Sequence, residues 1–271
     1  MKFSAVYALE KDIPFRVGIQ APLREALTTL VELGYDGVEL HIPNPFEVEV
    51  HPLKRSVNEF GLEVPAISTG LSYIKYGYSL SSGDESNRLA ATEFFKKYIE
   101  VAHHLDSRIV IVGTARGRCS GDCNSAKSRL VNSLKILGIY GRDMGVQLVL
   151  EPMNRRETDL INRVSEAIDI IKQVDNVWLL LDTYHLLIEE EDVYEVLQNY
   201  GMYARHIHVA DSNRLAPGLG ELRWDTILMI LGSIGYNKYV SIEALMEPNY
   251  RMALEIAIKS LKIHSKNLRG A

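Results

Sequence analysis

Cysteine is scarce in this chain: only two of its 271 residues are cysteines, at positions 119 and 123. A metal site built on this pair would need two more soft ligands close by, and the surrounding loop offers none. We therefore predict two reduced thiols in a surface loop. A local disulfide between Cys119 and Cys123 is the alternative.

Excess positive charge and long apolar runs are lacking as well. The chain has 30 Lys and Arg against 35 Asp and Glu, a formal net charge of −5, so it has no basic field to hold a nucleic-acid backbone. No apolar run approaches the length of a membrane span. The N-terminal segment meets Glu10, Lys11 and Asp12 too early for a signal peptide. We expect a soluble, cytoplasmic protein that binds neither nucleic acid nor membranes.

No low-complexity linker divides the chain, which indicates a single domain over residues 1–271. Strand-like and helix-like patterns alternate from end to end. Strands are expected at 2–7, 37–42, 63–69, 108–113, 147–151, 177–182, 205–208 and 239–243. Helices are expected at 22–33, 124–144, 165–174, 192–200, 224–234 and 249–268. Two further helices are expected to end at about residues 61 and 105, and 70–83 is expected to be a longer connection.

Eight strands in strict alternation with eight helices predict an α/β protein with a single (β/α)₈ TIM barrel. A doubly wound sheet is the alternative. It would normally carry a glycine-rich turn after the first strand. The segment that follows this strand, Ala8-Leu-Glu-Lys-Asp-Ile-Pro14, contains no glycine.

Four consecutive apolar runs in the second half of the chain each end in a side chain that can bind a metal. Their last residues are Glu151, Asp182, His208 and Glu243. A single strand-end carboxylate is more often a helix cap or an ion-pair partner, but four on successive strands indicate one site. In a barrel the carboxyl ends of the strands share one face, where active sites form. One divalent cation per chain would neutralise these carboxylates, and oxygen-rich ligation with one nitrogen suits Mn²⁺, Mg²⁺ or Co²⁺.

Three further polar residues follow these strand ends. Glu157 lies six residues after the first end, His185 three after the second, and Arg214 six after the third, just before a glycine-rich stretch at 217–220. Each of them alone is equally compatible with a solvated loop residue. Together they would lie on the same rim of the barrel.

Four segments carry a resemblance to a known family. They are Glu-Pro-Met-Asn-Arg-Arg-Glu (151–157), Leu-Asp-Thr-Tyr-His-Leu-Leu-Ile-Glu-Glu (181–190), His-Ile-His-Val-Ala-Asp-Ser-Asn-Arg-Leu-Ala-Pro-Gly-Leu-Gly (206–220) and Ser-Ile-Glu (241–243). In residues and in spacing they resemble the ketose 3-epimerases of the D-tagatose/D-psicose 3-epimerase type. These enzymes belong to the xylose-isomerase-like sugar isomerase/epimerase superfamily.

The resemblance implies a role for each of these residues. Glu151, Asp182, His208 and Glu243 would bind a Mn²⁺-like ion, and Glu151 and Glu243 would also exchange protons with a carbon of the sugar. Glu157, His185 and Arg214 would hold substrate oxygens. The chemistry is coherent, because a metal that chelates the carbonyl oxygen and the neighbouring hydroxyl stabilises an enediolate. Two glutamates on opposite faces of that intermediate invert one carbon without a redox cofactor.

The chain departs from the family near the substrate's far end. The family's free-ketohexose enzymes carry tryptophan and other aromatic residues near the first strand, whereas this chain has Tyr7 and Phe15 and no tryptophan before Trp178. After the fourth expected strand it carries Arg116 and Arg118 instead. Arginine matches the geometry of carboxylate and phosphate groups. We therefore count Arg116 among the substrate-binding residues and include keto-sugar acids among the expected substrates.

Glu39 and His41 alternate onto one face of the second expected strand. We expect them to form a buried ion pair or hydrogen bond rather than to bind the metal.

Other functions remain open at this point. The same metal set could catalyse aldose–ketose isomerisation, hydroxypyruvate-type isomerisation or dehydration of a cyclic polyol. An endonuclease IV-like DNA repair nuclease would need more metal ligands and a basic face, which eight histidines and a net charge of −5 fit poorly. A sugar-binding barrel that kept its metal without catalysis is a third reading. A homo-oligomer is also plausible for a barrel of this kind.

Overall fold

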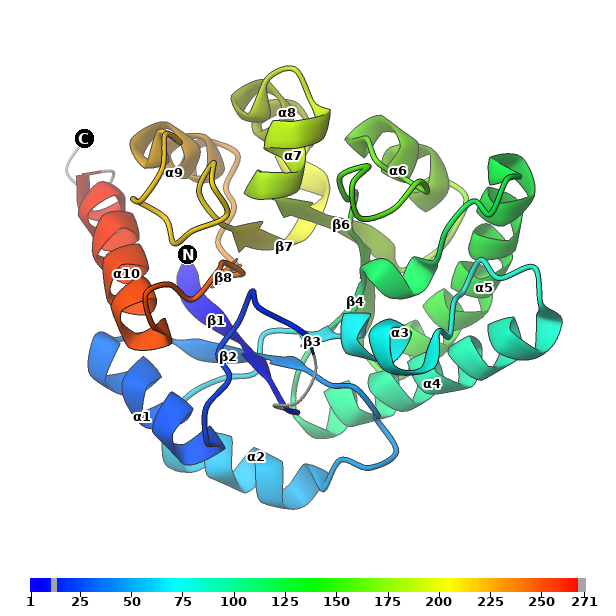
Figure 1. Cartoon of the computed structure of the whole chain (residues 1–271), viewed down its shortest axis with the longest axis horizontal. Helices are drawn as coiled ribbons and strands as arrows, with labels where there is room; N and C mark the ends of the chain where they lie inside the picture. Colours follow the sequence, from blue (N-terminus) through cyan, green and yellow to red (C-terminus); the bar gives the residue numbers. More distant parts are fainter. Residues whose placement is uncertain (11–13, 268–271) are drawn as a thin grey trace.

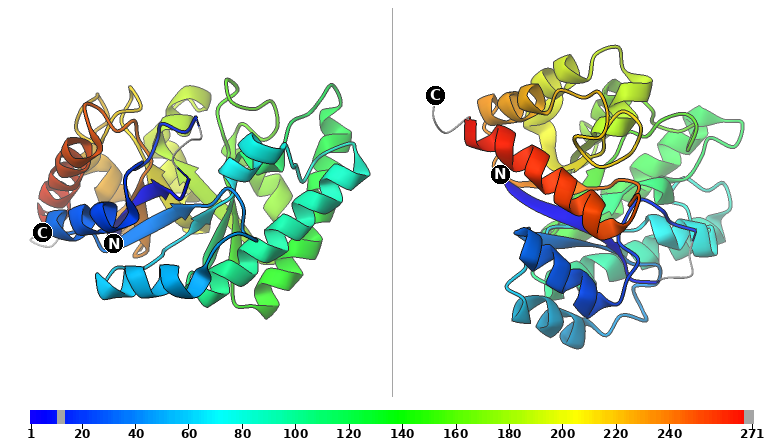
Figure 2. Two further views of the ribbon diagram at one scale, coloured as in Figure 1. Left: turned by 60° about the horizontal axis from the view of Figure 1, so that its bottom comes forward. Right: turned by 60° about the vertical axis from the view of Figure 1, so that its left-hand side comes forward.

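Eight parallel strands, β1 to β8, close into a barrel in chain order within the described residues. The computed structural model describes residues 1–10 and 14–267. Position 268, the expected end of the last helix, and positions 11–13 of the segment after the first strand lie outside the described residues. Helices surround the strands (Figure 1), and α10 lies beside α1, which completes the outer ring (Figures 1 and 2). The predicted (β/α)₈ TIM barrel is confirmed.

Most elements lie where the alternation predicted them, but the third strand is shorter than expected, and the helices at Gly70–Tyr76 and Thr183–Glu189 were not predicted. The strands are β1 (Lys2–Ala8), β2 (Gly37–His41), β3 (Ile67–Ser68), β4 (Ile109–Val112), β5 (Gln147–Leu150), β6 (Val177–Asp182), β7 (Ala204–Val209) and β8 (Tyr239–Ile242). The α-helices are α1 (Leu23–Leu33), α2 (Val50–Glu59), α3 (Gly70–Tyr76), α4 (Glu85–His104), α5 (Cys123–Asp143), α6 (Val164–Ile171), α7 (Thr183–Glu189), α8 (Val193–Tyr200), α9 (Trp224–Ser233) and α10 (Tyr250–Asn267). Two short 3₁₀ helices are η1 (Thr114–Arg116) and η2 (Gly201–Tyr203).

Local signals in the sequence account for several of these boundaries. Helix α1 ends at Gly34, whose positive φ of 79° is a conformation that glycine adopts without strain, and whose N–H caps the carbonyls of Leu30 and Val31. Helix α4 begins after Asp84, whose carboxylate accepts the backbone N–H groups of Ser86 and Asn87. No helix of the described chain is both long and apolar enough to cross a membrane.

The third strand is much shorter than the expected 63–69. Its hydrogen-bonded part covers only Ile67 and Ser68, preceded by an isolated bridge between Gly37 and Glu63. Pro65 lies between the two and has no backbone N–H to donate to a neighbouring strand, so the ladder is interrupted there. The connection expected after this strand contains a helix, α3, that the sequence did not indicate.

The two cysteines form a disulfide, so the prediction of reduced thiols was wrong. Cys123 begins α5, and the turn before the helix brings its Cα to 4.3 Å from that of Cys119. Cys119 is buried rather than on the surface, and its backbone N–H donates to the carboxylate of Asp159.

The interior of the barrel has an apolar side and a polar side. On the side of β4 to β6, a cluster of Ile109, Ile111, Val149 and Leu180, with Ala66, fills the space. On the side of β1, β2, β7 and β8 the fully buried residues include Ser4, Glu39, His206 and Ser241. The larger hydrophobic core lies between the strands and the helices. Polar groups are therefore buried inside the barrel, directly below the face where the expected site lies.

Candidate metal centre and substrate pocket

The four residues at the expected strand ends converge on one point. Glu151 directly follows β5, Asp182 is the last residue of β6, His208 lies in β7, and Glu243 directly follows β8. Each offers one oxygen or nitrogen atom, these atoms all lie within 4.8 Å of one another, and all four residues are buried. Parallel strands of a closed barrel place their carboxyl ends on one rim, so consecutive strands deliver these groups together.

Nδ1 of His208 stands at the centre of this group. It lies 3.5 Å from Oε2 of Glu243, 3.7 Å from Oε1 of Glu151 and 3.9 Å from Oδ2 of Asp182. Nδ1 of His208 and Oε1 of Glu151 are buried, and within the described chain neither has a hydrogen-bond partner. Buried polar atoms left unpaired are costly. Three carboxylate oxygens and one imidazole nitrogen are also the donors that Mn²⁺-type cations use, so these residues fit a divalent cation.

The charges of this cluster perturb one another strongly. Burial and the negative charge of Glu243 raise the pKa of Asp182 to about 7. Burial also opposes ionisation of Glu243, but the nearby positive charges of His208, His41 and Arg214 lower the pKa of Glu243 to about 2. Burial would lower the pKa of His208, but Glu39 and Glu243 raise it well above its ordinary value. Negative charge is thus in excess at this point, as expected where a cation binds.

Glu39 orients the histidine of this cluster from below. Nε2 of His208 lies 3.0 and 3.1 Å from the two carboxylate oxygens of Glu39, and Nε2 of His206 lies 2.7 Å from Oε2. Burial disfavours ionisation of Glu39 and would raise its pKa, but the charges of His208 and His206 lower this pKa well below the ordinary value. An N–H at Nε2 of His208 leaves the lone pair of Nδ1 directed at the cluster, the arrangement that metal-binding histidines use.

Sequence reasoning placed Glu39 and His41 in a buried ion pair or hydrogen bond, and the structure confirms this. Nε2 of His41 lies 3.3 Å from Oε1 of Glu39 and 3.6 Å from Oε1 of Glu243. Glu39, His206 and His208 also form a group of potential ligand atoms. In this second group the carboxylate oxygens already accept hydrogen bonds from both imidazoles. The four strand-end residues, with the unpaired ligand atoms Nδ1 of His208 and Oε1 of Glu151, are therefore the better candidate for a metal site.

Asp182 serves two purposes with its two oxygens. Oδ1 accepts the backbone N–H groups of Tyr184 and His185 and so caps the N-terminus of α7, while Oδ2 faces His208. The cap determines where α7 begins, and it thereby positions His185 one turn away on the same rim. This side chain can therefore act as a helix cap, the common role of a strand-end aspartate, and also as the proposed metal ligand.

Asn154 determines which nitrogen of His185 carries the proton. Oδ1 of Asn154 accepts the N–H of Arg156, so its amide nitrogen faces Oε1 of Glu157 at 3.2 Å and Nδ1 of His185 at 2.7 Å. Nδ1 is then an acceptor, and Nε2 carries the proton, 3.7 Å from Oε1 of Glu151. Burial lowers the pKa of His185, which keeps the ring neutral. The sequence-based reasoning missed Asn154, although it lies inside the motif 151–157.

Glu157 and Arg214 face each other across the rim. Nη1 of Arg214 donates to Oε1 of Glu157 over 2.5 Å, and the guanidinium lies 4.9 Å from the centre of the Tyr184 ring. Arg214 has a positive φ of 63°, in a turn where its N–H donates to the carbonyl of Asp211. The structure brings together all three loop residues that the sequence singled out: Glu157, His185 and Arg214 line the same pocket as Glu151 and Glu243.

This pocket has a volume of about 340 Å³. Four residues of its wall, 14–17, come from the segment after β1. The ring of Phe15 lies 4.7 Å from that of His41, and Arg16 pairs with Glu247. Of the two aromatic residues near the first strand, Tyr7 and Phe15, only Phe15 lines this pocket. A pocket of this size, polar at its base and with one aromatic wall, suits a small polar molecule.

Arg116 is not in this pocket. It ends η1 and is completely buried, and its Nη1 donates to the backbone carbonyls of Glu151 and Ile161. Because η1 turns the side chain beneath the backbone of Glu151, the guanidinium supports the rim from behind. This placement corrects the expectation that Arg116 binds substrate. Arg118 is exposed and donates to the carbonyl of Glu157.

Comparison with known proteins places this arrangement in a family. The model of the xylose isomerase-like TIM barrel matches residues 27–263. The chain belongs to this family. A D-psicose 3-epimerase of Ruminiclostridium cellulolyticum is 31% identical over 247 residues, covering 86% of this chain and 80% of the relative. An L-ribulose 3-epimerase of Mesorhizobium japonicum is 28% identical and covers 83% of this chain and 76% of the relative.

Solved structures of xylose isomerase-like barrels agree with these relatives. The structure of D-psicose 3-epimerase with D-tagatose from Clostridium cellulolyticum H10 superposes with a TM-score of 0.82 at 25% identity, over 98% of this chain and 99% of that chain. The resemblance to the ketose 3-epimerases, which the motifs between Glu151 and Glu243 indicated, is thereby confirmed.

Proposed function

We propose that this protein is a divalent-metal-dependent ketose 3-epimerase, an isomerase that inverts the carbon next to the ketone of a sugar. One observation carries the proposal. The carboxylates of Glu151 and Glu243, delivered by β5 and β8, open into the same pocket and flank Nδ1 of His208 at 3.7 and 3.5 Å. Two carboxylates that face one bound sugar can remove a proton from one side and return one to the other.

The charge on Glu243 suits the role of base. His208, His41 and Arg214 keep its pKa low, at about 2, so it is ionised at neutral pH and able to accept a proton. Glu151 approaches from β5, next to the N–H of His185. A divalent cation held by the four residues would supply positive charge that makes the carbon-bound proton more acidic and stabilises the enediolate. Glu151 and Glu243 then exchange protons with the carbon from its two faces.

The sugar would be held in position by His185, Glu157 and Arg214. Nε2–H of His185 is a donor directed at the pocket, Arg214 offers further donors, and Glu157 accepts from sugar hydroxyls. The contact between Glu157 and Arg214 holds both side chains against the wall of the pocket. A sugar bound by both donors and acceptors keeps its reacting carbon between the two glutamates, which is the main requirement of this reaction.

We propose Mn²⁺ as the preferred ion, one per chain, with Mg²⁺ and Co²⁺ as substitutes. The donor set of three oxygens and one nitrogen supports this choice. Metal-free protein prepared by chelation should regain activity most fully with Mn²⁺.

We propose a neutral ketose as the substrate. The case for a keto-sugar acid depended on Arg116 and Arg118. Arg116 is buried behind the site, and Arg118 donates to a backbone carbonyl. Turnover of D-psicose compared with its carboxylated counterpart tests this choice, and a clear preference for the acid would contradict it.

The test of the function is hydrogen exchange at the substrate carbon. The Mn²⁺-loaded protein in D₂O should convert D-psicose to its C3 epimer and replace the C3 proton with deuterium, both followed by NMR. Glu151→Gln and Glu243→Gln should each reduce exchange by about 10²–10⁴-fold. Glu221→Gln, an exposed glutamate on a rim loop, is the matched control and should behave as wild type.

Full exchange in both glutamine variants would contradict the proposed roles of Glu151 and Glu243. Bound Mn²⁺ is measured in each variant, because both glutamates are also proposed ligands. Only loss of exchange in a variant that still holds Mn²⁺ assigns proton transfer to that glutamate. Exchange at a different carbon, or an aldose as the product, would indicate the aldose–ketose or hydroxypyruvate-type isomerase.

A further inference from the structure

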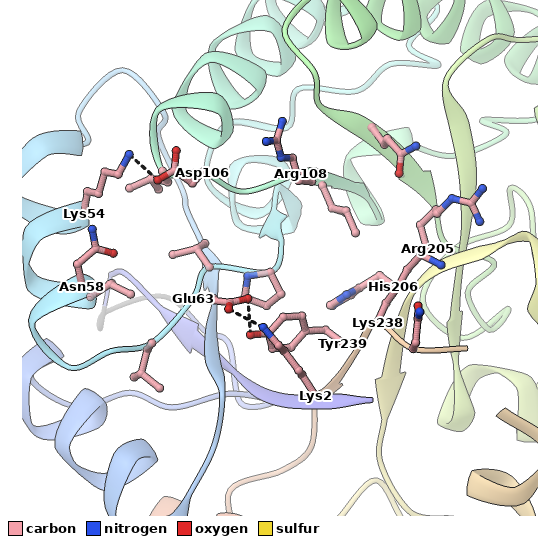
Figure 3. Close-up of a pocket in the computed structure, with 18 residues that line it drawn as sticks. Lys2, Lys54, Asn58, Glu63, Asp106, Arg108, Arg205, His206, Lys238 and Tyr239 are labelled. Carbon is pink, nitrogen blue, oxygen red and sulfur yellow. Dashed lines mark hydrogen bonds and ion pairs between the residues drawn. The ribbon is translucent and has the colours of Figure 1, made fainter. Parts of the chain in front are cut away.

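A second cavity, of about 500 Å³, lies at the opposite end of the barrel, where the strands begin (Figure 3). Lys2 and Tyr239 are the first residues of β1 and β8, and Arg108 immediately precedes β4. Lys54 and Asn58 of α2 form another side of the cavity. It therefore opens on the face remote from the proposed epimerase site.

This cavity is rich in positive charge. Its basic residues are Lys2, Lys54, Arg108, Arg205 and Lys238, and its acidic residues are Glu63 and Asp106. Both acids are already engaged: Glu63 pairs with Lys2 at 2.5 Å and Asp106 with Lys54 at 2.7 Å. Three cations remain in excess, on a protein whose net charge is −5. The local charge is thus opposite to that of the molecule as a whole.

The three remaining cations have other contacts but no acid. The guanidinium of Arg205 lies 3.5 Å from the centre of the Trp178 ring, Lys238 stacks on Tyr236, and Arg108 donates to a backbone carbonyl at 3.4 Å. No carboxylate lies within ion-pair distance of these three among residues 1–10 and 14–267. Burial lowers the pKa of Arg205, and burial together with the charge of Arg205 lowers the pKa of Lys238.

Arg205 and Lys238 both line the cavity on the side of β7 and β8 (Figure 3). Ile207 of β7 is in register with Val240 of β8, so Arg205 and Lys238, each two positions earlier, are neighbours across the two strands. Two like charges held close together repel each other, and a shared anion between them removes this repulsion. The stacking of Arg205 on Trp178 restricts its guanidinium and keeps the charge in place. The pair is therefore a suitable place for an anionic group.

The inner wall of the cavity is largely apolar. Its apolar residues include Val57, Leu62, Leu105 and Ile109, and the buried His206 also lines it. His206 is completely buried, its Nε2 is occupied by Glu39, and its Nδ1 has no partner in the described chain. Apolar surface beside a cationic edge suits a molecule with a nonpolar body and a charged end.

We propose that this cavity binds a small organic anion, with its carboxylate or phosphate group between Arg205 and Lys238 and its nonpolar body against the apolar wall. Arg108 adds to the attraction from the far side of the cavity. The site is independent of the proposed catalytic centre, because its ligand enters from the opposite face of the barrel.

Calorimetric titration of the metal-loaded protein at low ionic strength tests this proposal. Phenyl phosphate and benzoate carry the two anionic groups on one apolar body, and benzyl alcohol is the neutral control. We expect at least one of the two anions to bind and benzyl alcohol not to bind, and raising the salt concentration should weaken the binding. The stronger of the two anions identifies phosphate or carboxylate as the preferred group. Absence of binding by both anions, or equal binding of benzyl alcohol, overturns the proposal.

Substitutions locate the anion. Arg205→Gln and Lys238→Gln should each weaken binding by about tenfold or more, because each removes a charge-assisted contact. Lys172→Gln, an exposed lysine outside the cavity, is the matched control and should bind as wild type. If Arg214→Gln abolishes binding while Arg205→Gln and Lys238→Gln leave it unchanged, the anion binds at the metal-site rim and the proposal fails. Equal weakening by Lys172→Gln would show nonspecific attraction, which also overturns it.

Discussion

Nε2 of His208 lies 3.0 Å from Oε1 of Glu39, deep inside the barrel, while Nδ1 of the same ring faces the three strand-end carboxylates. One imidazole thus connects a completely buried carboxylate to the proposed metal. Glu39 holds the ring in the tautomer whose free lone pair is on the metal side. The affinity of the proposed metal site consequently depends on Glu39, a residue that does not itself bind the metal.

Glu39→Gln should weaken Mn²⁺ binding by about 10- to 100-fold, because the ring loses its negatively charged partner and its preferred orientation. The affinity is measured by titrating the metal-free variant with Mn²⁺. Glu63→Gln, a change to an exposed carboxylate that also belongs to an ion pair, should leave the affinity unchanged. Wild-type affinity in Glu39→Gln would show that packing alone orients His208.

Asp182→Asn should stabilise the metal-free protein. The pKa of Asp182 is raised to about 7, mainly by burial and then by the charge of Glu243. The folded state therefore favours the protonated form. Ionising the buried Asp182 carboxyl lowers the free energy of unfolding. This loss is absent below the ordinary pKa of about 4, grows as the pH rises, and is complete above pH 7. Asparagine has no such cost and keeps the oxygen that caps α7.

The free energy of unfolding, measured with chelator at pH 8 and at pH 5, checks this expectation. The variant should exceed wild type by a few kcal/mol at pH 8 and by less at pH 5. With Mn²⁺ the order should reverse, because the variant has lost a ligand. Asp175→Asn, at an exposed position, provides the baseline. A variant that is less stable than wild type at pH 8 without metal would mean that charge repulsion is unimportant here.

Asn154→Ala should reduce kcat without weakening metal binding. Without the amide, Nδ1 of His185 loses its donor, and the proton is no longer confined to Nε2, the nitrogen that faces the pocket. A reduction of roughly 10- to 100-fold is the usual cost of one such buried hydrogen bond. Steady-state kinetics on a ketose and Mn²⁺ titration separate the two effects. Asn199→Ala, at an exposed position of α8, serves as control. Unchanged kcat in Asn154→Ala would remove the positioning role.

Asp211→Asn should destabilise the loop that carries Arg214. The carboxylate of Asp211 accepts the N–H groups of Ser212, Gly218 and Leu222 and the indole N–H of Trp224. Burial opposes ionisation, but these four bonds together lower the pKa of Asp211 below its ordinary value. An amide presents its own N–H groups to donors, so the variant should lose about 2–4 kcal/mol of unfolding free energy at pH 7.

The pH dependence distinguishes this effect from simple packing. Because the folded-state pKa is lowered, the stabilisation is present above the unfolded-state pKa of about 4 and is lost as the pH falls through the folded-state value. The difference in stability between wild type and Asp211→Asn should therefore begin to shrink as the pH falls below about 4 and should disappear once the pH has passed the folded-state value. Asp143→Asn, on the exposed end of α5, should track wild type throughout. A gap that persists unchanged at pH 3 would show that the charge is not responsible.

The sequence alone was sufficient to predict the barrel and to choose four residues that converge at its rim. Each buried parallel strand is a short apolar run, and a metal-binding side chain directly after it can be recognised without any knowledge of tertiary contacts. Glu151, Asp182, His208 and Glu243 could be chosen in this way because chain order and strand order are the same in a barrel. The loop residues Glu157, His185 and Arg214 were found by their short distances along the chain from those ends.

Tertiary structure decided what depends on the direction of a side chain or on contacts between distant strands. Arg116 follows a strand just as Glu157 does, but a 3₁₀ turn directs it beneath the rim. Glu39 and His206 are 167 positions apart, and only closure of the barrel brings their side chains to 2.7 Å. The basic cavity likewise collects residues from strand beginnings that no local pattern connects. Local patterns specify where a strand ends, whereas the pairing of buried charges depends on the closed sheet.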